Sequence, residues 1–464
     1  MANTNLTEEE LLYKRKNVFE SKAISAEDAY AYCEGYKEFL DLSKTEREAV
    51  AYGVKAAEKE GFRPYTFGCD VKPGDKFYYN NRGKSLFLFV IGSEPIEGGI
   101  HIAAAHVDSP RVDLKQNPLY ESDGLGYFKT HYYGGIKKYQ WTALPLALHG
   151  VFVKEDGTTV DVNIGEDESD PVFYISDLLP HLAKDQVVKR ANEVIEGEAL
   201  NLIAGSEADT EAECAEKIKI NLLKILNQKY GITEADFQSA ELCAVPAFRA
   251  RDVGLDCSMI SSYGHDDRVC AYPALTALLR AQNPKKTIMA ILADKEETGS
   301  NGATGMQCAV LVDLIEDLAN TLGGNRRTVR QNSFCLSADV NAAYDPNFAG
   351  VYEKMNSAYL NSGVAISKYT GSRGKSDTND ASAEVVAKLR KMFTEGGVPY
   401  QMCELGKVDA GGGGTVAKYI SEKNIDTIDA GVPVISMHSP YEVVSKYDVY
   451  SMYLGMCALF GTEA

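Results

Sequence analysis

The sequence lacks the features that mark two large classes of binding protein. Its 464 residues carry 48 lysines and arginines against 66 aspartates and glutamates, which leaves a formal charge of −18. A surface that follows phosphate groups needs the opposite sign, so we expect neither nucleic acid nor an anionic membrane as a partner. The apolar runs are also too short to span a bilayer, and the longest, such as residues 86–91, suit buried strands.

Paired cysteines and a secretion signal are lacking as well. The ten cysteines contain no Cys-x-x-Cys spacing, so neither a thiolate zinc cluster nor a dithiol redox motif is expected. In the first thirty residues charged positions alternate with apolar ones, without the uninterrupted apolar stretch of a signal peptide. We therefore expect a cytoplasmic protein. Apolar residues make up 45% and charged residues 25% of the chain, which is typical of a globular protein.

The pattern along the chain predicts an α/β fold. Residues 7–60 indicate two or three amphipathic helices, in which Thr7 and Ser43 each begin the S/T-x-x-E pattern of a capping box. From residue 85 onward, short apolar runs predict strands that are buried on both faces. After about residue 248, predicted strands and helices alternate, which is the pattern of a sheet covered by helices.

The middle of the chain differs in composition, because it is rich in aromatic and turn-forming residues. A hairpin is predicted around Asp156-Gly157, where two alternating apolar segments flank a turn sequence. We therefore expect an inserted, smaller β-rich domain of residues 116–245. Residues 1–115 and 246–464 would together form the main α/β domain.

Histidine is scarce, with seven residues in the chain, so a histidine beside carboxylates at a strand end is a candidate ligand. His106 and Asp108 follow a buried strand. The two-residue period of a strand puts them on the same side, where the histidine could bind a metal ion and the aspartate could orient it.

Four further groups of polar residues stand at the carboxyl ends of predicted strands or in the loops just after them. Open α/β sheets bind their ligands at this edge. Each group alone reads as a helix cap or a solvated loop, and the five groups together favour a site. The four groups are His265-Asp266-Asp267, residues 294–297, Asp339 and His438.

Two histidines and three carboxylates, one of them shared, suit a pair of divalent ions. Zinc is the natural candidate, and cobalt or manganese are possible. Such a pair activates water for attack on a carbonyl. The neighbouring Glu296 and Glu297 could then divide the work of general base and metal ligand, since adjacent side chains on an extended segment diverge. The alternative for this pair is an exposed helix start.

Five segments resemble, in order and spacing, the motifs of the aspartyl aminopeptidase and vacuolar aminopeptidase I family. The segments are AAAHVDSPR, GHDDR, DKEETGS, SADVNAAYDPN and DAGVPVISMHS. The resemblance spans nearly the whole chain and implies a role for each candidate residue. By resemblance, one ion is held by His106 and Asp339, the other by Glu297 and His438, Asp266 bridges them, Glu296 is the general base, and Asp108 orients His106.

The resemblance also implies the fold and the activity. The fold would be a mixed central sheet flanked by helices, of the metallo-exopeptidase type, in which the inserted domain mediates dimerisation. The activity would be that of an aminopeptidase that removes N-terminal residues from peptides with free N-termini by means of metal-activated water. The family implies homododecamers that are built from dimers and keep the active sites inside.

Weaker matches indicate residues that contact the substrate. By resemblance, His181 reaches the pocket of a neighbouring subunit, Lys354 lies near the substrate, and Gly412 and Gly413 belong to an active-site loop. Asp345 departs from the family pattern, because several members have a histidine there. A carboxylate repels an acidic substrate side chain, so we expect no strong preference for N-terminal Asp or Glu, with Lys354 as the counterweight.

Two other readings stay open. A dinuclear deacylase or carboxypeptidase would use the same metal ligands on a different amide bond. An inactive metal-binding scaffold would keep the fold, although it would not need the free base Glu296. A phosphate-binding loop is excluded, because Tyr369 occupies the position where that pattern needs glycine.

Overall fold

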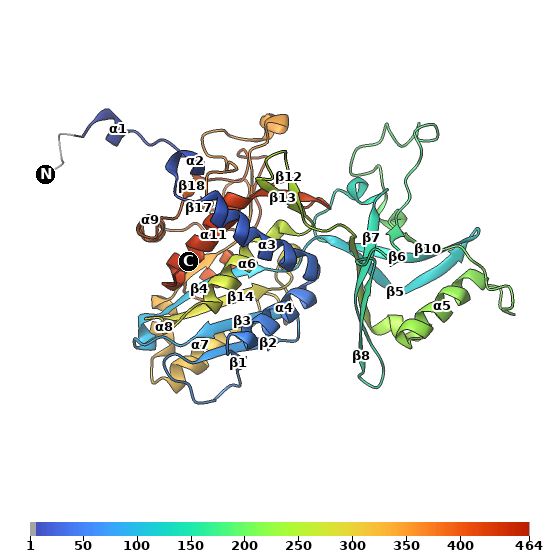
Figure 1. Ribbon diagram of the computed structural model, residues 1–464, viewed down its shortest axis with the longest axis horizontal. Helices are drawn as coiled ribbons and strands as arrows, with labels where there is room; N and C mark the ends of the chain where they lie inside the picture. Colours follow the sequence, from blue (N-terminus) through green and yellow to red (C-terminus); the bar gives the residue numbers. More distant parts are fainter. Residues whose placement is uncertain (1–5, 464) are drawn as a thin grey trace.

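The computed structural model describes residues 6–463 as two lobes of unequal size (Figure 1). The larger lobe contains both ends of the described chain and is built on a nine-stranded sheet in the order β1-β2-β3-β14-β4-β15-β19-β17-β18. These strands are β1 (Arg63–Pro64), β2 (Lys76–Asn81), β3 (Ser85–Val90), β14 (Thr287–Ala293), β4 (Ile100–His106), β15 (Phe334–Ser337), β19 (Asp426–Gly431), β17 (Val364–Ser367) and β18 (Tyr400–Cys403).

The four central strands β14, β4, β15 and β19 are parallel, so their carboxyl ends lie at one edge of the sheet. Strand β3 pairs with β2 and β14 in the antiparallel sense, and β17 does so with β19. The sheet is therefore mixed. Together with its helices it confirms the predicted fold class.

Helices cover both faces of this sheet. Along β3, Leu86, Leu88 and Val90 face one core, whereas Phe87 and Phe89 face the other. This alternation explains the uninterrupted apolar run, because both faces are buried. The first core includes α3 (Ala26–Leu42), α4 (Glu46–Lys59), α6 (His265–Leu279), α9 (Ala383–Glu395) and α11 (Lys446–Phe460), and the second includes α7 (Val310–Thr321), α8 (Arg326–Asn332) and α10 (Ala417–Ser421).

The amino-terminal region differs in part from the prediction. It holds four helices, because two short ones, α1 (Glu8–Leu11) and α2 (Val18–Ser21), precede α3 and α4. The capping box at Thr7 is confirmed. The box predicted at Ser43 is wrong, since Thr45 and Glu48 cap α4 instead. The carboxylate of Glu46 is used in an ion pair with the other lobe.

The smaller lobe contains a seven-stranded antiparallel sheet in the order β11-β5-β6-β10-β9-β7-β8. An additional pairing of β11 with β7 closes it like a barrel around its own core, and α5 (Lys217–Tyr230) packs against it. The strands are β5 (Arg111–Ser122), β6 (Leu125–Tyr133), β7 (Pro145–Val153), β8 (Thr159–Ile164), β9 (Phe173–Tyr174), β10 (Leu202–Gly205) and β11 (Ala240–Pro246).

The strands of this lobe extend from residue 111 to residue 246, a range slightly wider than the expected inserted domain of residues 116–245. The hairpin predicted around Asp156-Gly157 is confirmed, with Val153 paired to Thr159. Gly157 has a φ of +84°, which glycine adopts without the strain of a side chain.

A third sheet has five short strands that the sequence pattern does not reveal. Its order is β12 (Arg251–Val253), β13 (Met259–Ser262), β21 (Glu442–Ser445), β20 (Pro433–Ile435) and β16 (Asn341–Ala342). The apolar stretch around residues 432–437 contains β20, which belongs to this small sheet and not to the main one. The chain leaves the main sheet at the end of β19 and then enters β20. Within residues 6–463, no helix is both long and apolar enough to cross a membrane.

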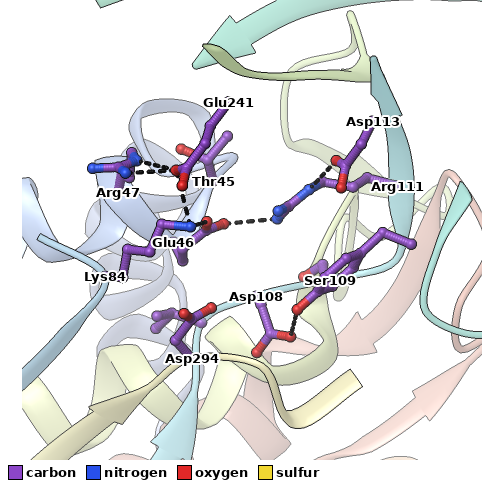
Figure 2. A network of polar contacts seen from close by, with 12 residues as sticks. Thr45, Glu46, Arg47, Lys84, Asp108, Ser109, Arg111, Asp113, Glu241 and Asp294 are labelled. Atoms are coloured by element: carbon purple, nitrogen blue, oxygen red, sulfur yellow. Dashed lines mark hydrogen bonds and ion pairs between the residues drawn. The ribbon is translucent and has the colours of Figure 1, made fainter. Parts of the chain in front are cut away.

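Buried ion pairs join the two lobes (Figure 2). Nη1 of Arg111, on β5, lies 2.7 Å from Oε2 of Glu46, on α4, and Lys84 lies between Glu46 and Glu241. Burial alone would raise the pKa of Glu46, but the charges of Arg111 and Lys84 lower it to about 2. Ion pairs of this kind are costly to break, because the remaining partner would be a buried charge.

A second interlobe contact centres on His149 of β7. Its ring is 1% exposed, with Nδ1 2.7 Å from Oε1 of Glu48 and Nε2 3.0 Å from Oε1 of Glu166. Burial lowers the pKa of His149, but the two carboxylates outweigh it and raise the pKa to about 9. The charged imidazolium therefore ties α4 of the larger lobe to the smaller lobe.

We predict that this contact makes stability depend on pH. The folded pKa of about 9 lies above the ordinary value of 6.5, so the stabilisation is complete below pH 6.5 and is lost as the pH rises through 9. His149→Gln stays neutral at every pH. Its free-energy deficit against the wild type, measured by urea unfolding, should shrink by about 3 kcal/mol between pH 6 and 10. A deficit that is constant over this range would contradict the assignment.

Candidate metal centre

The five predicted ligands meet at one place although they come from five segments of the chain. His106 ends β4, Asp266 lies in the first turn of α6 just after β13 of the small sheet, and Asp339 follows β15. Glu297 lies in the 3-10 helix η5 (Glu296–Thr298) after β14, and His438 follows β20 of the small sheet. Parallel pairing of β14, β4 and β15 brings three of them to the same sheet edge. The small sheet supplies the other two.

Asp266 lies between the two histidines. Its Oδ1 is 3.1 Å from Nε2 of His106, and its Oδ2 is 3.1 Å from Nε2 of His438. Asp339 lies on the His106 side, with Oδ1 4.0 Å from Nε2, and Glu297 lies on the His438 side, with Oε1 3.4 Å from Nε2. The geometry thus gives each histidine its own carboxylate and one that is shared.

The charges and burial of these groups fit divalent cations. Oδ1 of Asp266 and Oε1 of Glu297 are buried and have no hydrogen-bond partner among the described residues. Burial raises the pKa values of Glu297 and Asp339 well above the ordinary carboxyl range. Buried carboxylates of this kind are normally paired or bind metal, and imidazole nitrogens with carboxylate oxygens are a donor set that zinc accepts.

The ligand atoms are also close enough together to share an ion. There are three groups of residues in which the possible ligand atoms of each group lie within 4.8 Å of one another. The groups are His106 with Glu296 and Asp339, His106 with Asp266 and Glu297, and Asp266 with Asp267 and Asp339. The overlap of the groups at His106 and Asp266 indicates one continuous site.

The two neighbouring glutamates point to different histidines. Oε2 of Glu296 lies 3.8 Å from Nε2 of His106, whereas Glu297 faces His438. The prediction that an extended segment separates the two side chains is wrong. Lys295 has a φ of +65° and begins a 3-10 turn, which directs the two side chains apart. Burial raises the pKa of Glu296 to about 7.

Asp108 contacts both sides of the site. Its backbone carbonyl lies 2.9 Å from Nδ1 of His106, and its carboxylate oxygen Oδ1 is 3.4 Å from the same nitrogen. The carboxylate also accepts the backbone N–H groups of Glu296 and Glu297 at 3.1 and 3.2 Å. A hydroxyl of the smaller lobe, that of Tyr133, donates to it at 2.7 Å. Asp108 therefore positions the glutamate turn as well as His106.

Sequence reasoning missed Glu442 of β21. Its side chain is 1% exposed and accepts the backbone N–H of Asp266 at 3.0 Å and that of His438 at 2.6 Å. Burial raises its pKa to about 8. One carboxylate thus holds the backbones of two ligand residues together. Nothing in the local sequence marks it, because the contact with Asp266 spans 176 positions.

The neighbours of Asp266 have separate roles. His265 does not face the centre, since Tyr36 lies 2.7 Å from its Nδ1 and the carbonyl of Ile260 lies 3.2 Å from its Nε2. Oδ2 of Asp267 accepts the backbone N–H of His106 at 3.2 Å. The buried guanidinium of Arg268 donates to Ser109 Oγ and the Val107 carbonyl, which ties the end of β4 to α6.

The predicted substrate-binding residues lie on exposed segments. His181 is exposed between β9 and β10 of the smaller lobe, and Nζ of Lys354 lies 5.7 Å from the centre of the Tyr344 ring. Gly412 has a φ of +117°, and a Cβ there would lie 2.6 Å from Cα of Ser372. Gly412 is therefore required by close backbone packing. The N–H of Gly413 donates to the carbonyl of Thr370.

The sequence and the fold match known proteins. A family model described as aminopeptidase I zinc metalloprotease (M18) matches residues 39–460. The chain belongs to the M18 family. A probable M18 family aminopeptidase 1 from Clostridium acetobutylicum is 51% identical over 439 residues, which are 93% of this chain and 94% of that protein.

Solved structures agree with this assignment. An M18 aminopeptidase from Thermotoga maritima has a TM-score of 0.93 at 44% identity, over 97% of this chain and 99% of that one. The mApe1 dodecamer of S. cerevisiae has a TM-score of 0.74 at 21% identity, over 94% and 96%, and shows the likeness of fold alone. The resemblance stated from the motifs is confirmed. This M18 protein is a metal-dependent aminopeptidase, a hydrolase that acts on peptides.

We predict that Glu442→Gln weakens metal binding without unfolding the protein. A glutamine has one carbonyl oxygen to accept two N–H groups, so one ligand backbone loses its partner. Supporting contacts of this kind are worth about 10- to 100-fold in metal affinity. Zinc titration calorimetry of the metal-free protein measures the change.

Asp448→Asn is the matched control. Asp448 is also a buried carboxylate that accepts two backbone N–H groups, those of Asn361 and Gly363, and neither belongs to the metal centre. Its variant should lose stability and keep the zinc affinity of the wild type. An equal loss of affinity in both variants would show that Glu442 acts through general stability.

Proposed function

We propose that this M18 aminopeptidase holds two divalent ions and removes N-terminal residues from peptides with free N-termini. The observation that carries the proposal is the placement of Asp266, which presents one carboxylate oxygen to each histidine at 3.1 Å. In this proposal His106 and Asp339 would hold one ion, Glu297 and His438 would hold the other, and Asp266 would offer one carboxylate oxygen to each. Zinc is the expected metal, since the family is one of zinc metalloproteases, and cobalt or manganese are possible.

When bound, such ions supply Lewis acidity, which polarises a peptide carbonyl and makes water more acidic. The chain itself supplies the proton acceptor. Oε2 of Glu296 lies 3.8 Å from Nε2 of His106, and a carboxylate at this distance from the ligands can act as the general base. Glu296 takes a proton from the attacking water and returns it to the amine that leaves.

Asp108 acts on this step through position. Its carboxylate accepts the N–H groups of both Glu296 and Glu297, so the base and the ligand stay on their own sides of the site. The carbonyl of Asp108 holds Nδ1 of His106, which leaves Nε2 to face the carboxylates. A fixed imidazole orientation of this kind makes histidine a better ligand.

We also propose a homododecamer built from dimers, with the smaller lobe as the dimerisation domain and His181 in the pocket of a neighbouring subunit. The dodecamer of S. cerevisiae mApe1, which shares this fold, supports the proposal. A cytoplasmic location is supported by the ten cysteines, which are all unpaired in the described structure. Asp345 still predicts no strong preference for acidic N-terminal residues.

The activity is tested with pairs of peptides that differ only in N-terminal acetylation. An aminopeptidase should cleave each free peptide and leave the acetylated partner intact, and a chelator should abolish cleavage. Cleavage of the blocked peptides, or release of carboxyl-terminal residues, would instead indicate a deacylase or a carboxypeptidase. A protein that binds zinc and cleaves none of the peptides would be a scaffold.

The two glutamates should separate in a second experiment. Glu296→Gln removes the proton acceptor, so kcat should fall by about 10²- to 10⁴-fold while KM and the zinc content change little. Glu297→Gln removes a ligand, so it should lose one ion and regain activity as zinc is added, because weakened binding responds to mass action. If added zinc restored only Glu296→Gln, the two roles would be reversed.

A further inference from the structure

A three-residue segment of the smaller lobe contacts the metal centre. Residues 133–135, which are the last residue of β6 and the two residues after it, form this segment. The hydroxyl of Tyr133 donates to Asp108, and the carbonyl of Gly135 lies 2.8 Å from Nδ1 of His438. A Cβ on Gly134 would lie 3.3 Å from both Cβ and Oε2 of Glu297. The segment thus contacts residues of the centre that belong to the larger lobe.

The contact with Gly135 determines which nitrogen of His438 is free. A backbone carbonyl can only accept a hydrogen bond, so Nδ1 of His438 must donate. The lone pair of the neutral ring then lies on Nε2, which faces Asp266 and Glu297. In the same way, Nδ1 of His106 donates to the carbonyl of Asp108, just after the end of its own strand. The two histidines are therefore oriented by different lobes.

Close approach of the segment depends on its glycines. Gly134 has a φ of +71°, a backbone conformation that a side chain disfavours. A Cβ on Gly135 would lie 3.4 Å from Nδ1 of His438. The absence of side chains lets the backbone of the smaller lobe lie against Glu297 and His438, the two residues on the same side of Asp266.

The segment is held in place by the packing of the lobes. Tyr133 pairs with Arg111 across β6 and β5, and the guanidinium of Arg111 lies 4.4 Å from the centre of the Tyr133 ring. The same guanidinium forms the ion pair with Glu46 of the larger lobe, as Figure 2 shows. Displacement of the smaller lobe would therefore move the 133–135 segment away from His438.

We infer that the 133–135 segment controls one of the two ion positions. It lies directly against Glu297 and His438, which make one position, whereas it reaches the position made by His106 and Asp339 only through Asp108. Docking of the smaller lobe then determines how tightly one ion is held. This inference rests on the proposed two-ion centre, and it assigns to the smaller lobe a positioning role in metal binding.

The test compares Gly134→Ala and Tyr133→Phe with the wild type by zinc titration calorimetry of the metal-free proteins. Both variants should keep one site at its wild-type affinity and weaken the other by about 10- to 100-fold, the range for contacts that orient ligands. Gly134→Ala should have the larger effect, because its methyl group would press on Glu297. Tyr133→Phe adds no atom and removes the donor to Oδ2 of Asp108, the oxygen that also accepts the N–H of Glu297, so it decides the question if Gly134→Ala does not fold.

Two controls match the chemistry of these variants. Gly124 has a φ of +85° in the turn between β5 and β6, with open space around a Cβ, so Gly124→Ala carries the same backbone strain away from the centre. Tyr132 is 41% exposed and lies beside Tyr133. Both Gly124→Ala and Tyr132→Phe should bind zinc as the wild type does.

The outcomes separate the inference from the proposed function. Equal weakening of both ions, or of neither, in Tyr133→Phe would overturn the role of the segment and leave the two-ion centre standing. A wild-type protein that binds fewer than two ions would overturn the proposed centre itself. Selective loss of one ion in the two variants, with both controls intact, would establish the inference.

Discussion

Buried negative charge at the carboxyl edge of the central sheet is the constraint on which the rest of the site depends. Several carboxylates share this small volume, and burial raises the pKa values of most of them. Like charges in a poorly solvated interior repel, so the fold must supply donors and positive charge. The carboxylates are Asp108, Asp266, Asp267, Glu296, Glu297, Asp339 and Glu442.

The loops at this edge have the form that this compensation needs. Backbone N–H groups of the glutamate turn point to Asp108, and those of Asp266 and His438 point to Glu442. The guanidinium of Arg268 is buried and ties the end of β4 to α6. Carboxylate oxygens that have no such donor, such as Oδ1 of Asp266 and Oε1 of Glu297, remain available to bind cations.

The division into two lobes has a consequence for function. The smaller lobe has its own core and its own closed sheet, yet it is joined to the larger lobe by buried charged pairs. Such pairs require a defined geometry, because breaking one leaves a buried charge without its partner. A lobe that is held by directional contacts can keep a carbonyl within hydrogen-bond distance of His438, which a loosely packed apolar contact would not ensure.

The sequence by itself determined the chemistry of the site and the class of the fold. Apolar runs of strand length, each followed by a histidine or an acidic residue, predicted buried strands with ligands at their ends. The alternation of side chains along a strand and the position of ligand residues just after it involve only residues close together in the sequence, so a local pattern can reveal them. The order and spacing of five motifs then indicated the family.

The tertiary structure alone decided which residues support that chemistry. Glu442, Arg268 and the 133–135 segment act on ligands that lie far away along the chain, and no local pattern records a contact between distant segments. The same reason explains the errors. The box predicted at Ser43 failed because Glu46 pairs with Arg111 of the other lobe. The five-stranded sheet went unseen because its strands are short and become stable only when they pair with one another.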